Sequence, residues 1–202
     1  YTTLFRSRGA MVIVSHLGNS EMLRGLAHSA ETGVSYQFAV NTILDTKVTA
    51  GFNAMVNKIN ASATVDIFNA DKVRPDTILI LQEKVERGEL VVIAGDRMSA
   101  NTKNRFIMQD FLGKSAPFAY GAYLLTALIN APTYFMFGVR KKDISIFPQY
   151  DMFVHKNPVS FDCPRKEREE RIKQTIANYA HELEKLCIQH PYQWFNFFEF
   201  WK

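Results

Sequence analysis

His16 is the residue of this chain best placed to do chemistry. It follows directly on the apolar run 11–14, which is typical of a buried strand. Ligands of open α/β sheets bind where such strands end. Glu21 lies five residues further on. A carboxylate beside an imidazole fixes its tautomer and raises its basicity, so the spacing predicts that Glu21 orients His16 as a general base.

The residues between this pair favour a turn into a helix. Gly18 allows a sharp turn, and Asn19 or Ser20 can cap a helix that runs to about residue 31. Glu21 then falls in the first turn, where the helix dipole favours a carboxylate. We expect His16 and Glu21 to be catalytic, and Gly18 and Asn19 to contact the substrate.

Two further segments are candidate binding sites. The buried strand predicted at 90–94 is followed by Gly95, Asp96 and Arg97, which could bind an anionic headgroup or order the site. A structural ion pair in a loop is the alternative for Asp96 and Arg97. Phe111 and Gly113 precede a charge-free helix and are predicted to bind substrate, with a plain turn as the alternative.

Patterns for other chemistries are incomplete. Met108 stands where a phosphate-binding loop ending at 113–115 needs glycine, and Lys185 stands where a zinc-protease helix needs its second histidine. The sequence has no Gly-x-Ser-x-Gly elbow. The two cysteines, Cys163 and Cys187, cannot form a four-ligand zinc site alone. We therefore expect no metal.

The composition is that of an ordinary globular chain. It has 202 residues, 47% of them hydrophobic and 13% aromatic, which argues against disorder. Two cysteines exclude a disulfide scaffold. The net charge of +4 favours an acidic partner or an anionic surface but is too small to indicate nucleic-acid binding.

The order of elements predicts an α/β fold with a largely parallel central sheet flanked by helices. Strands are expected at 11–14, 34–40, 63–68 and 90–94. Helices are expected at about 20–31, 43–59 and 76–85.

The second half of the chain is expected to complete this fold. Residues 115–139 carry no charge over 25 positions. Pro132 interrupts them, so they are interpreted as a buried helix at 115–130 and a strand at 133–139, with a membrane span as the alternative. A strand at 143–148 and a helix at 165–189 follow. The charges at 165–173 fit a solvated helix face or a docking surface.

The first residues do not look like a natural start. The chain begins YTTLFRS without methionine, and these letters are also the translation of the end of a common sequencing adapter. We expect residues 1–8 to be an artefact or a truncated start, and residues 9–202 to form a single domain.

Four blocks together resemble the lysophospholipid acyltransferase superfamily, in the bacterial branch of the late acyltransferases of lipid A biosynthesis. They are HLGNSE at 16–21, GELVVIAGDR at 88–97, FLGKSAPFAYGAYLLTALINAPTYFMF at 111–137 and PYQWFNFFEFW at 191–201. Within that branch the chain most resembles predicted acyltransferases found with aryl polyene clusters. The superfamily more often has Asp where this chain has Glu21, and many lipid A relatives have Asp-Gln where it has Asp96-Arg97.

The resemblance implies a glycerol-3-phosphate acyltransferase-like fold and direct acyl transfer without a cofactor. The donor would be a fatty acyl thioester of acyl carrier protein or coenzyme A, and the acceptor a hydroxyl or amine of a lipid or glycolipid. His16 would be the base, and backbone N–H groups near Gly18 or Gly95 would bind the oxyanion. Arg97 would hold a phosphate or the donor's phosphopantetheine.

The resemblance also implies peripheral attachment to the cytoplasmic face of a bacterial inner membrane, with no nucleic-acid partner. The aromatic residues at 194–201 could line an acyl tunnel or meet lipid, or they could be a tail packed on the core. Two alternatives to an acyltransferase stay open: a non-catalytic binder of lipid or acyl carrier, and a thioesterase or lipid hydrolase.

Overall fold

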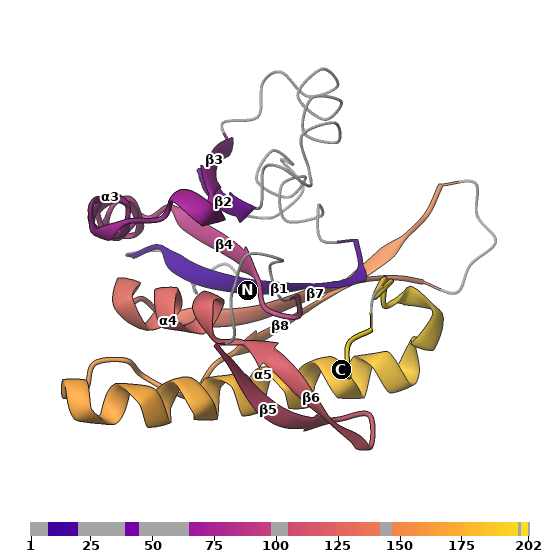
Figure 1. Ribbon diagram of the computed structural model, residues 1–202. Coiled ribbons are helices and arrows are strands. Elements are labelled where there is room, and N and C mark those ends of the chain that lie inside the picture. Colours follow the sequence, from indigo (N-terminus) through magenta and orange to yellow (C-terminus); the bar gives the residue numbers. More distant parts are fainter. Residues whose placement is uncertain are drawn as a thin grey trace.

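A six-stranded sheet organises the chain in the computed structural model, which describes residues 8–19, 39–44, 65–97, 105–141, 147–197 and 199–201 (Figure 1). The strand order is β3-β2-β4-β1-β7-β8. All neighbours are parallel except β7 and β8, so the predicted α/β class with a largely parallel sheet is confirmed. The strands are β1 (Ala10–Gly18), β2 (Val40–Leu44), β3 (Val65–Asn69), β4 (Leu90–Ala94), β7 (Thr133–Arg140) and β8 (Tyr150–Lys156).

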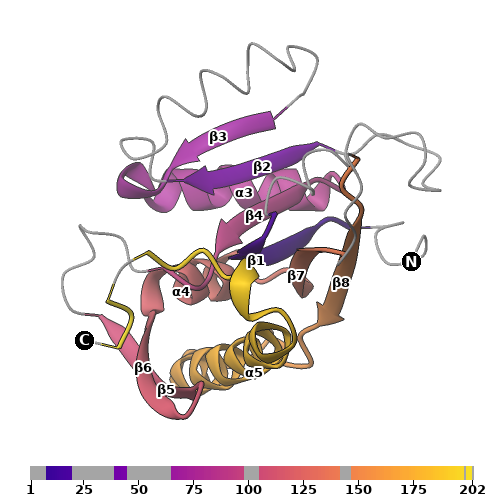
Figure 2. The same cartoon turned by 90° about the vertical axis from the view of Figure 1, so that its right-hand side faces the viewer.

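Three helices pack on one face of this sheet: α3 (Pro75–Glu86), α4 (Tyr120–Ile129) and α5 (Arg168–Gln189) (Figure 2). Met11 of β1 packs with Leu81 of α3 and Leu125 of α4. Ile13, two residues further along β1, packs with Tyr179 of α5. Odd-numbered residues of β1 therefore face the helices, whereas the even-numbered residue Val12 belongs to a second buried cluster.

An antiparallel hairpin precedes α4. Its strands are β5 (Phe106–Phe111) and β6 (Lys114–Ala119). The predicted helix over 115–130 is therefore wrong in its first part, because residues 114–119 pair with β5 and the helix begins only at Tyr120. It ends where Asn130 takes a left-handed conformation (φ 54°). Among the described residues, no helix is both long and apolar enough to cross a membrane.

The other predicted elements divide into three groups. The strands at 11–14, 63–68, 90–94 and 133–139 and the helices at 76–85 and 165–189 are confirmed within a few residues, with residues 165–167 forming a 3₁₀ turn. Of the strand expected at 143–148, residues 143–146 lie outside the described residues, Phe147 and Pro148 are not in a strand, and β8 pairs with β7 from Tyr150 onward. The predicted helix at 20–31 lies outside the described residues.

The predictions for residues 34–59 can be compared only in part. Of the strand expected at 34–40, residues 34–38 lie outside the described residues, residue 39 is not in a strand, and Val40 is the first residue of β2. The helix expected at 43–59 starts with Ile43 and Leu44, which belong instead to β2 because they pair with β3. Its remaining residues lie outside the described part of the chain.

Charges at the start of α5 pair with one another along the helix. Arg171 lies 3.8 Å from Glu167, and Lys173 lies 3.8 Å from Glu169, in both cases one helical turn apart. All four side chains are at least 37% exposed. Such pairs are typical of a solvated helix face, which is the first of the two interpretations of this charged run.

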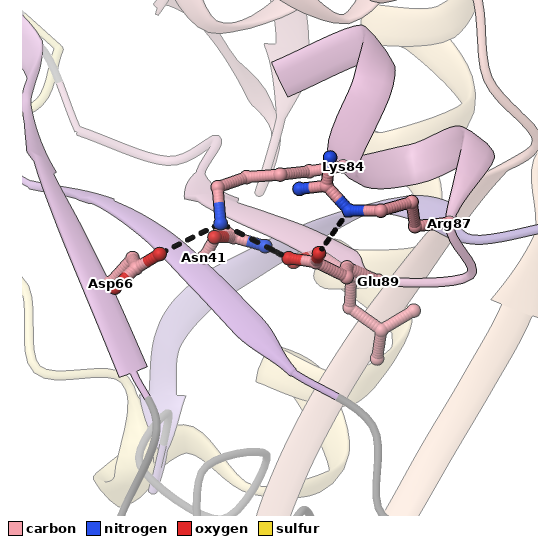
Figure 3. A network of polar contacts seen from close by, with 6 residues as sticks. Asn41, Asp66, Lys84, Arg87 and Glu89 are labelled. Atoms are coloured by element: carbon pink, nitrogen blue, oxygen red, sulfur yellow. Dashed lines mark hydrogen bonds and ion pairs between the residues drawn. The ribbon is translucent and has the colours of Figure 1, made fainter. Parts of the chain in front are cut away.

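A polar network ties α3 to the amino-terminal end of β4 (Figure 3). Glu89 accepts hydrogen bonds from Lys84 (3.2 Å), Arg87 (3.0 Å) and the amide of Asn41 (2.9 Å). Lys84 also donates to Asp66 of β3 at 2.7 Å. The network therefore links three neighbouring strands with the helix that precedes β4.

These contacts shift the pKa values of the two central groups in the directions that stabilise the folded state. Partial burial opposes the charged form of Glu89, but the hydrogen bonds from Asn41, Lys84 and Arg87 outweigh it, so the pKa of Glu89 lies below its usual 4.5. Partial burial likewise opposes the charge on Lys84. Hydrogen bonds to Asp66 and Glu89 outweigh it and raise the pKa of Lys84 above its usual 10.5.

We predict that Glu89→Gln lowers the free energy of unfolding by about 1–3 kcal/mol at pH 7, since the buried Asn41 amide and the largely buried Lys84 ammonium lose a charged acceptor. The pKa of Glu89 is lowered in the folded state, so its contribution is present above pH 4.5 and is lost as the pH falls further. Urea unfolding at pH 7 and near pH 3.5 measures both effects. Glu86→Gln, an exposed position on α3, is the control and should change stability by less than about 0.5 kcal/mol. An equal loss in the two variants would contradict the role given to the network.

Candidate active site

A bulge in β1 brings His16 to the carboxyl end of the sheet. Val14 pairs with Met136 of β7, and Gly18 pairs with Gly138. Three β1 residues thus lie between these pairs where β7 has one. Such a bulge bends the strand and redirects the side chains within it, which is common next to active sites.

Gly18 closes this bulge in a conformation that other residues adopt only with strain. Its φ is +66°, and a Cβ at this position would overlap the carbonyl oxygen of Gly138. The next residue, Asn19, donates its backbone N–H to that same oxygen at 2.7 Å. Gly18 is thus required by the close approach of β1 and β7.

The carboxylate of Asp96 holds His16 at two points. Asp96 Oδ1 lies 2.8 Å from the ring Nδ1 of His16, and Oδ2 accepts the backbone N–H of the same residue at 2.7 Å. The Asp96 side chain is 1% exposed, whereas the His16 side chain is 32% exposed. An ionised carboxylate only accepts hydrogen bonds, so Nδ1 carries the proton, and in the neutral ring Nε2, on the other side, keeps its lone pair.

A carboxy-terminal strap, residues 190–201, completes the surroundings of this carboxylate. The indole Nε1–H of Trp194 donates to Asp96 Oδ2 at 3.2 Å. Trp194 also forms an antiparallel bridge with Leu17, and the backbone N–H of Phe195 donates to the carbonyl oxygen of His16 at 2.9 Å. In Figures 1 and 2 the yellow end of the chain lies beside the end of β1.

Two buried tyrosines support the strand ends from the helix side. Tyr179 of α5 donates its hydroxyl to the carbonyl of Val14 at 2.8 Å, and Tyr123 of α4 donates to that of Gly95 at 3.1 Å. Burial, and to a smaller extent the charge of Asp96, raise the pKa of both tyrosines well above the usual value. Both hydroxyls therefore remain neutral donors and hold β1 and β4 in place.

The structure brings two of the predicted segments together. Asp96, predicted to bind substrate, lies against His16. Arg97 is exposed directly after it. The predicted partner of His16, Glu21, lies outside the described residues, so its catalytic role stays a prediction.

The backbone N–H of Gly95 makes a hydrogen bond within the protein. Its N–H donates to the carbonyl of Val14 at 2.9 Å, so this group is not available to bind an oxyanion. A Cβ at Gly95 would crowd Ile13, Tyr123 and Tyr179. The N–H of Gly95 itself is therefore already used, and an oxyanion donor elsewhere near Gly18 or Gly95 stays a prediction.

The segment around Phe111 lies at the tip of the hairpin and does not enter a helix. Phe111 is fully buried, and its ring contacts those of Phe118, Trp194, Phe200 and Trp201 at centroid distances of 5.1–6.5 Å. Gly113 forms the turn with φ +77° and open space around it. Phe111 is thus a core residue of the aromatic cluster, and the turn, the alternative interpretation of this segment, is what the structure shows.

The sequence analysis considered Trp194 only as an aromatic ring and did not predict that its indole N–H donates a hydrogen bond in the site. The aromatic ending was expected to contact acyl chains or lipid, and nothing in the sequence indicates that one indole N–H reaches Asp96.

The thiol of Cys187 is buried, and burial together with the charges of Asp96 and Glu184 raises its pKa to about 12, so it is not a nucleophile. Among the described residues no three His, Cys, Asp or Glu side chains are grouped as a metal site requires.

Comparison with known families now adds to this geometry. A model of the bacterial lipid A biosynthesis acyltransferase family matches residues 2–202. The chain belongs to this family. It is an acyltransferase that acts on lipid substrates. A comparison with curated proteins gave no match.

The family membership gives the His16–Asp96 pair its context. The acyltransferase has an imidazole held by a buried carboxylate at the carboxyl end of parallel strands, where ligands of such sheets bind. Acyl transfer to a hydroxyl or amine needs a base that removes a proton. The geometry therefore provides one group able to perform the step that the reaction class requires.

We predict that Gly18→Ala destabilises the acyltransferase by about 2–4 kcal/mol, since it adds left-handed strain and an overlap with Gly138. Gly113→Ala is the matched control: its φ is also positive, but a Cβ there meets nothing. It should cost only about 1 kcal/mol. Urea unfolding of both variants measures the difference, and equal losses would contradict the requirement for a close approach at Gly18.

Proposed function

We propose that this acyltransferase moves a fatty acyl group from a thioester to a hydroxyl or amine of a lipid or glycolipid, with His16 as the general base. The observation that carries the proposal is the 2.8 Å contact between His16 Nδ1 and the buried Asp96 carboxylate. It leaves Nε2 as the basic nitrogen on a partly exposed ring. The family membership supports transfer over the two alternatives, hydrolysis and non-catalytic binding.

The reaction follows from this arrangement without an acyl-enzyme. Nε2 takes the proton of the acceptor, and the acceptor oxygen or nitrogen attacks the thioester carbonyl carbon. The tetrahedral intermediate then collapses, the carbon–sulfur bond breaks, and the imidazolium returns the proton to the leaving thiolate. Asp96 stabilises the imidazolium between these two transfers. The products are an ester or amide and a free thiol.

Two carboxylates are candidates to orient the base. Asp96 contacts His16 in the described structure, and the same carboxylate also fixes the backbone of His16. Glu21, five residues after His16, remains the predicted orienting group of the HLGNSE block. We propose that Asp96 fixes the tautomer, and substitution of each acid separately tests how much each contributes.

The donor and acceptor are further parts of the proposal. The donor would be an acyl thioester of acyl carrier protein or coenzyme A, with no other cofactor. Arg97, exposed after Asp96, could pair with a phosphate of the donor or acceptor. Gly18 and Asn19 lie at the same strand end and remain proposed substrate contacts. The glycerol-3-phosphate acyltransferase-like fold and the closeness to the aryl polyene branch remain predictions.

We also propose that the enzyme works on the cytoplasmic face of a bacterial inner membrane, attached peripherally. Tyr192 and Phe197 of the strap are 95% and 86% exposed, and Phe106 and Met108 of the hairpin are 42% and 49% exposed. Exposed aromatic side chains favour the boundary between lipid and water. The net charge of +4 adds attraction to anionic lipid.

We predict that His16→Ala abolishes acyl transfer and that Asp96→Asn lowers kcat at least 100-fold, because the wrong tautomer then faces the acceptor. Glu21→Gln should cost at least about ten-fold. The measurement is thiol release and lipid labelling with a labelled long-chain acyl-carrier-protein thioester and total bacterial lipid extract. His155→Ala is the matched control, since His155 also lies near a carboxylate, Glu182, and should retain full activity.

The outcomes of this assay separate the competing functions. Lipid labelling that depends on His16 supports the proposal and gives the acceptor by mass. Thiol release without labelled lipid would indicate a hydrolase. Tight thioester binding without any release would indicate a binding protein. Transfer that survives in folded His16→Ala would overturn the assignment of the base.

We predict that Phe197→Ser weakens binding to vesicles containing anionic lipid about ten-fold, because burial of a phenylalanine in lipid contributes roughly 1.5–3 kcal/mol. Sedimentation with vesicles measures the change. Phe147→Ser is the control, because Phe147 is 82% exposed at the turn between β7 and β8. Equal losses, or none, would argue against Phe197 as a lipid-contacting side chain.

A further inference from the structure

We propose that Trp194 is a positioning residue for His16: its indole N–H fixes the Asp96 carboxylate so that one oxygen faces the imidazole. The inference rests on the proposed function of His16 as the base. The indole N–H of Trp194 donates to Asp96 and not to the imidazole ring or to a reacting atom of the proposed mechanism. It would act through Asp96.

The two oxygens of Asp96 have different partners. Oδ2 accepts the backbone N–H of His16 at 2.7 Å and the indole N–H of Trp194 at 3.2 Å. Oδ1 faces Nδ1 of His16 at 2.8 Å. With Oδ2 held by two neutral donors, rotation of the carboxylate about its Cβ–Cγ bond would break both bonds. The pair of donors therefore directs Oδ1 at the imidazole.

The backbone of the strap fixes where the indole can lie. Trp194 bridges to Leu17, and Phe195 N–H donates to the carbonyl of His16 at 2.9 Å. Before them, the amide of Gln193 accepts from Arg140 N–H and donates to Arg140 carbonyl, both at 2.8 Å. The strap is thus bound to the ends of both β1 and β7. Its register, and with it the position of the indole, follows from those strands.

Aromatic packing then fixes the direction of the ring. Trp194 contacts Phe111 and Phe200 at centroid distances of 5.1 Å each, with interplanar angles of 70° and 83°, and Trp201 at 6.1 Å. Edge-to-face contacts of this kind restrain the side-chain angles. The indole N–H is held toward Asp96 before substrate binds, as preorganised catalytic groups require.

The chain offers a matched control in its other tryptophan. Trp201 belongs to the same aromatic cluster, and its indole N–H also makes one hydrogen bond, to the carbonyl of Phe111 at 3.3 Å. That bond holds the hairpin and has no part in the surroundings of Asp96. Trp194→Phe and Trp201→Phe therefore remove the same atoms from the same cluster, and only the first removes a donor to the carboxylate.

The first experiment compares kcat, KM and thermal midpoint of these two variants in the acyl-transfer assay. We expect Trp194→Phe to lower kcat about ten-fold or more, the effect of losing a hydrogen bond to a charged group, while KM for the thioester stays within about two-fold. Trp201→Phe should lower the thermal midpoint by about as much as Trp194→Phe does, but its kcat should stay near that of the wild type. An equal fall of kcat in both variants, or none in Trp194→Phe, overturns the proposal.

A second measurement does not depend on activity. Nitrogen-15 NMR of the histidine rings reports which ring nitrogen of His16 carries the proton, with His16→Gln used to assign the signals. We expect the Nδ1–H form to dominate in the wild type and in Trp201→Phe, and a mixture of tautomers in Trp194→Phe. Benzothienylalanine at position 194, which keeps the ring shape but lacks the N–H, should give the same mixture.

The two readouts separate this inference from the proposed function. If no variant and no wild-type protein transfers an acyl group, the proposed function fails, and the tautomer ratio alone decides on Trp194. An unchanged ratio with benzothienylalanine at position 194 would show that the indole supports the fold only.

Discussion

A buried carboxylate must have its hydrogen bonds supplied by the protein, and the carboxylate of Asp96 sets this requirement for the whole carboxyl edge of the sheet. Its partners come from widely separated parts of the chain: His16 on β1 and Trp194 on the strap. Each of them reaches Asp96 only because another feature holds it there. The bulge brings in His16, and the bonds from the strap to β1 and β7 bring in the indole.

The two helices that pack beneath the site, α4 and α5, also hold its backbone in place. Tyr123 on α4 donates to the carbonyl of Gly95, next to Asp96, and Tyr179 on α5 donates to that of Val14, two residues before His16. Because burial keeps both hydroxyls neutral, they add dipoles but no charge near the carboxylate. The charged network around Glu89 lies at the opposite end of β4. Charged and neutral polar groups thus support opposite ends of the same strand.

Much of this arrangement could be predicted from short apolar runs, because strands buried on both faces are continuous and end abruptly at polar residues. His16 and Asp96 were each placed correctly at the end of such a strand. That they meet could not be read from the sequence, since it depends on β4 lying next to β1 in the sheet order. By its spacing Glu21 was the predicted partner of His16, whereas Asp96 was predicted only to bind a headgroup, order the site or pair with Arg97.

The failures have equally definite causes. After Lys114 the residues of β6 carry no charge and lead directly into α4, so nothing in their pattern separates a strand from a helix, and only pairing with β5 does so. Phe147 and Pro148, the described end of the strand expected at 143–148, precede β8, whose start at Tyr150 depends on its register with β7. Only the ring of Trp194 was considered in the sequence, because a single side-chain hydrogen bond, unlike a helix or a strand, produces no repeating pattern of residues.

The contacts of Asp96 also bear on how the molecule folds. They join residues 80 and 98 positions apart, and the bond from Tyr179 to Val14 spans 165. Contacts so distant in sequence need long loops to close, whereas helical turns form from local contacts. Recovery of enzymatic turnover during refolding is therefore a stricter criterion of the native state than recovery of helical circular dichroism.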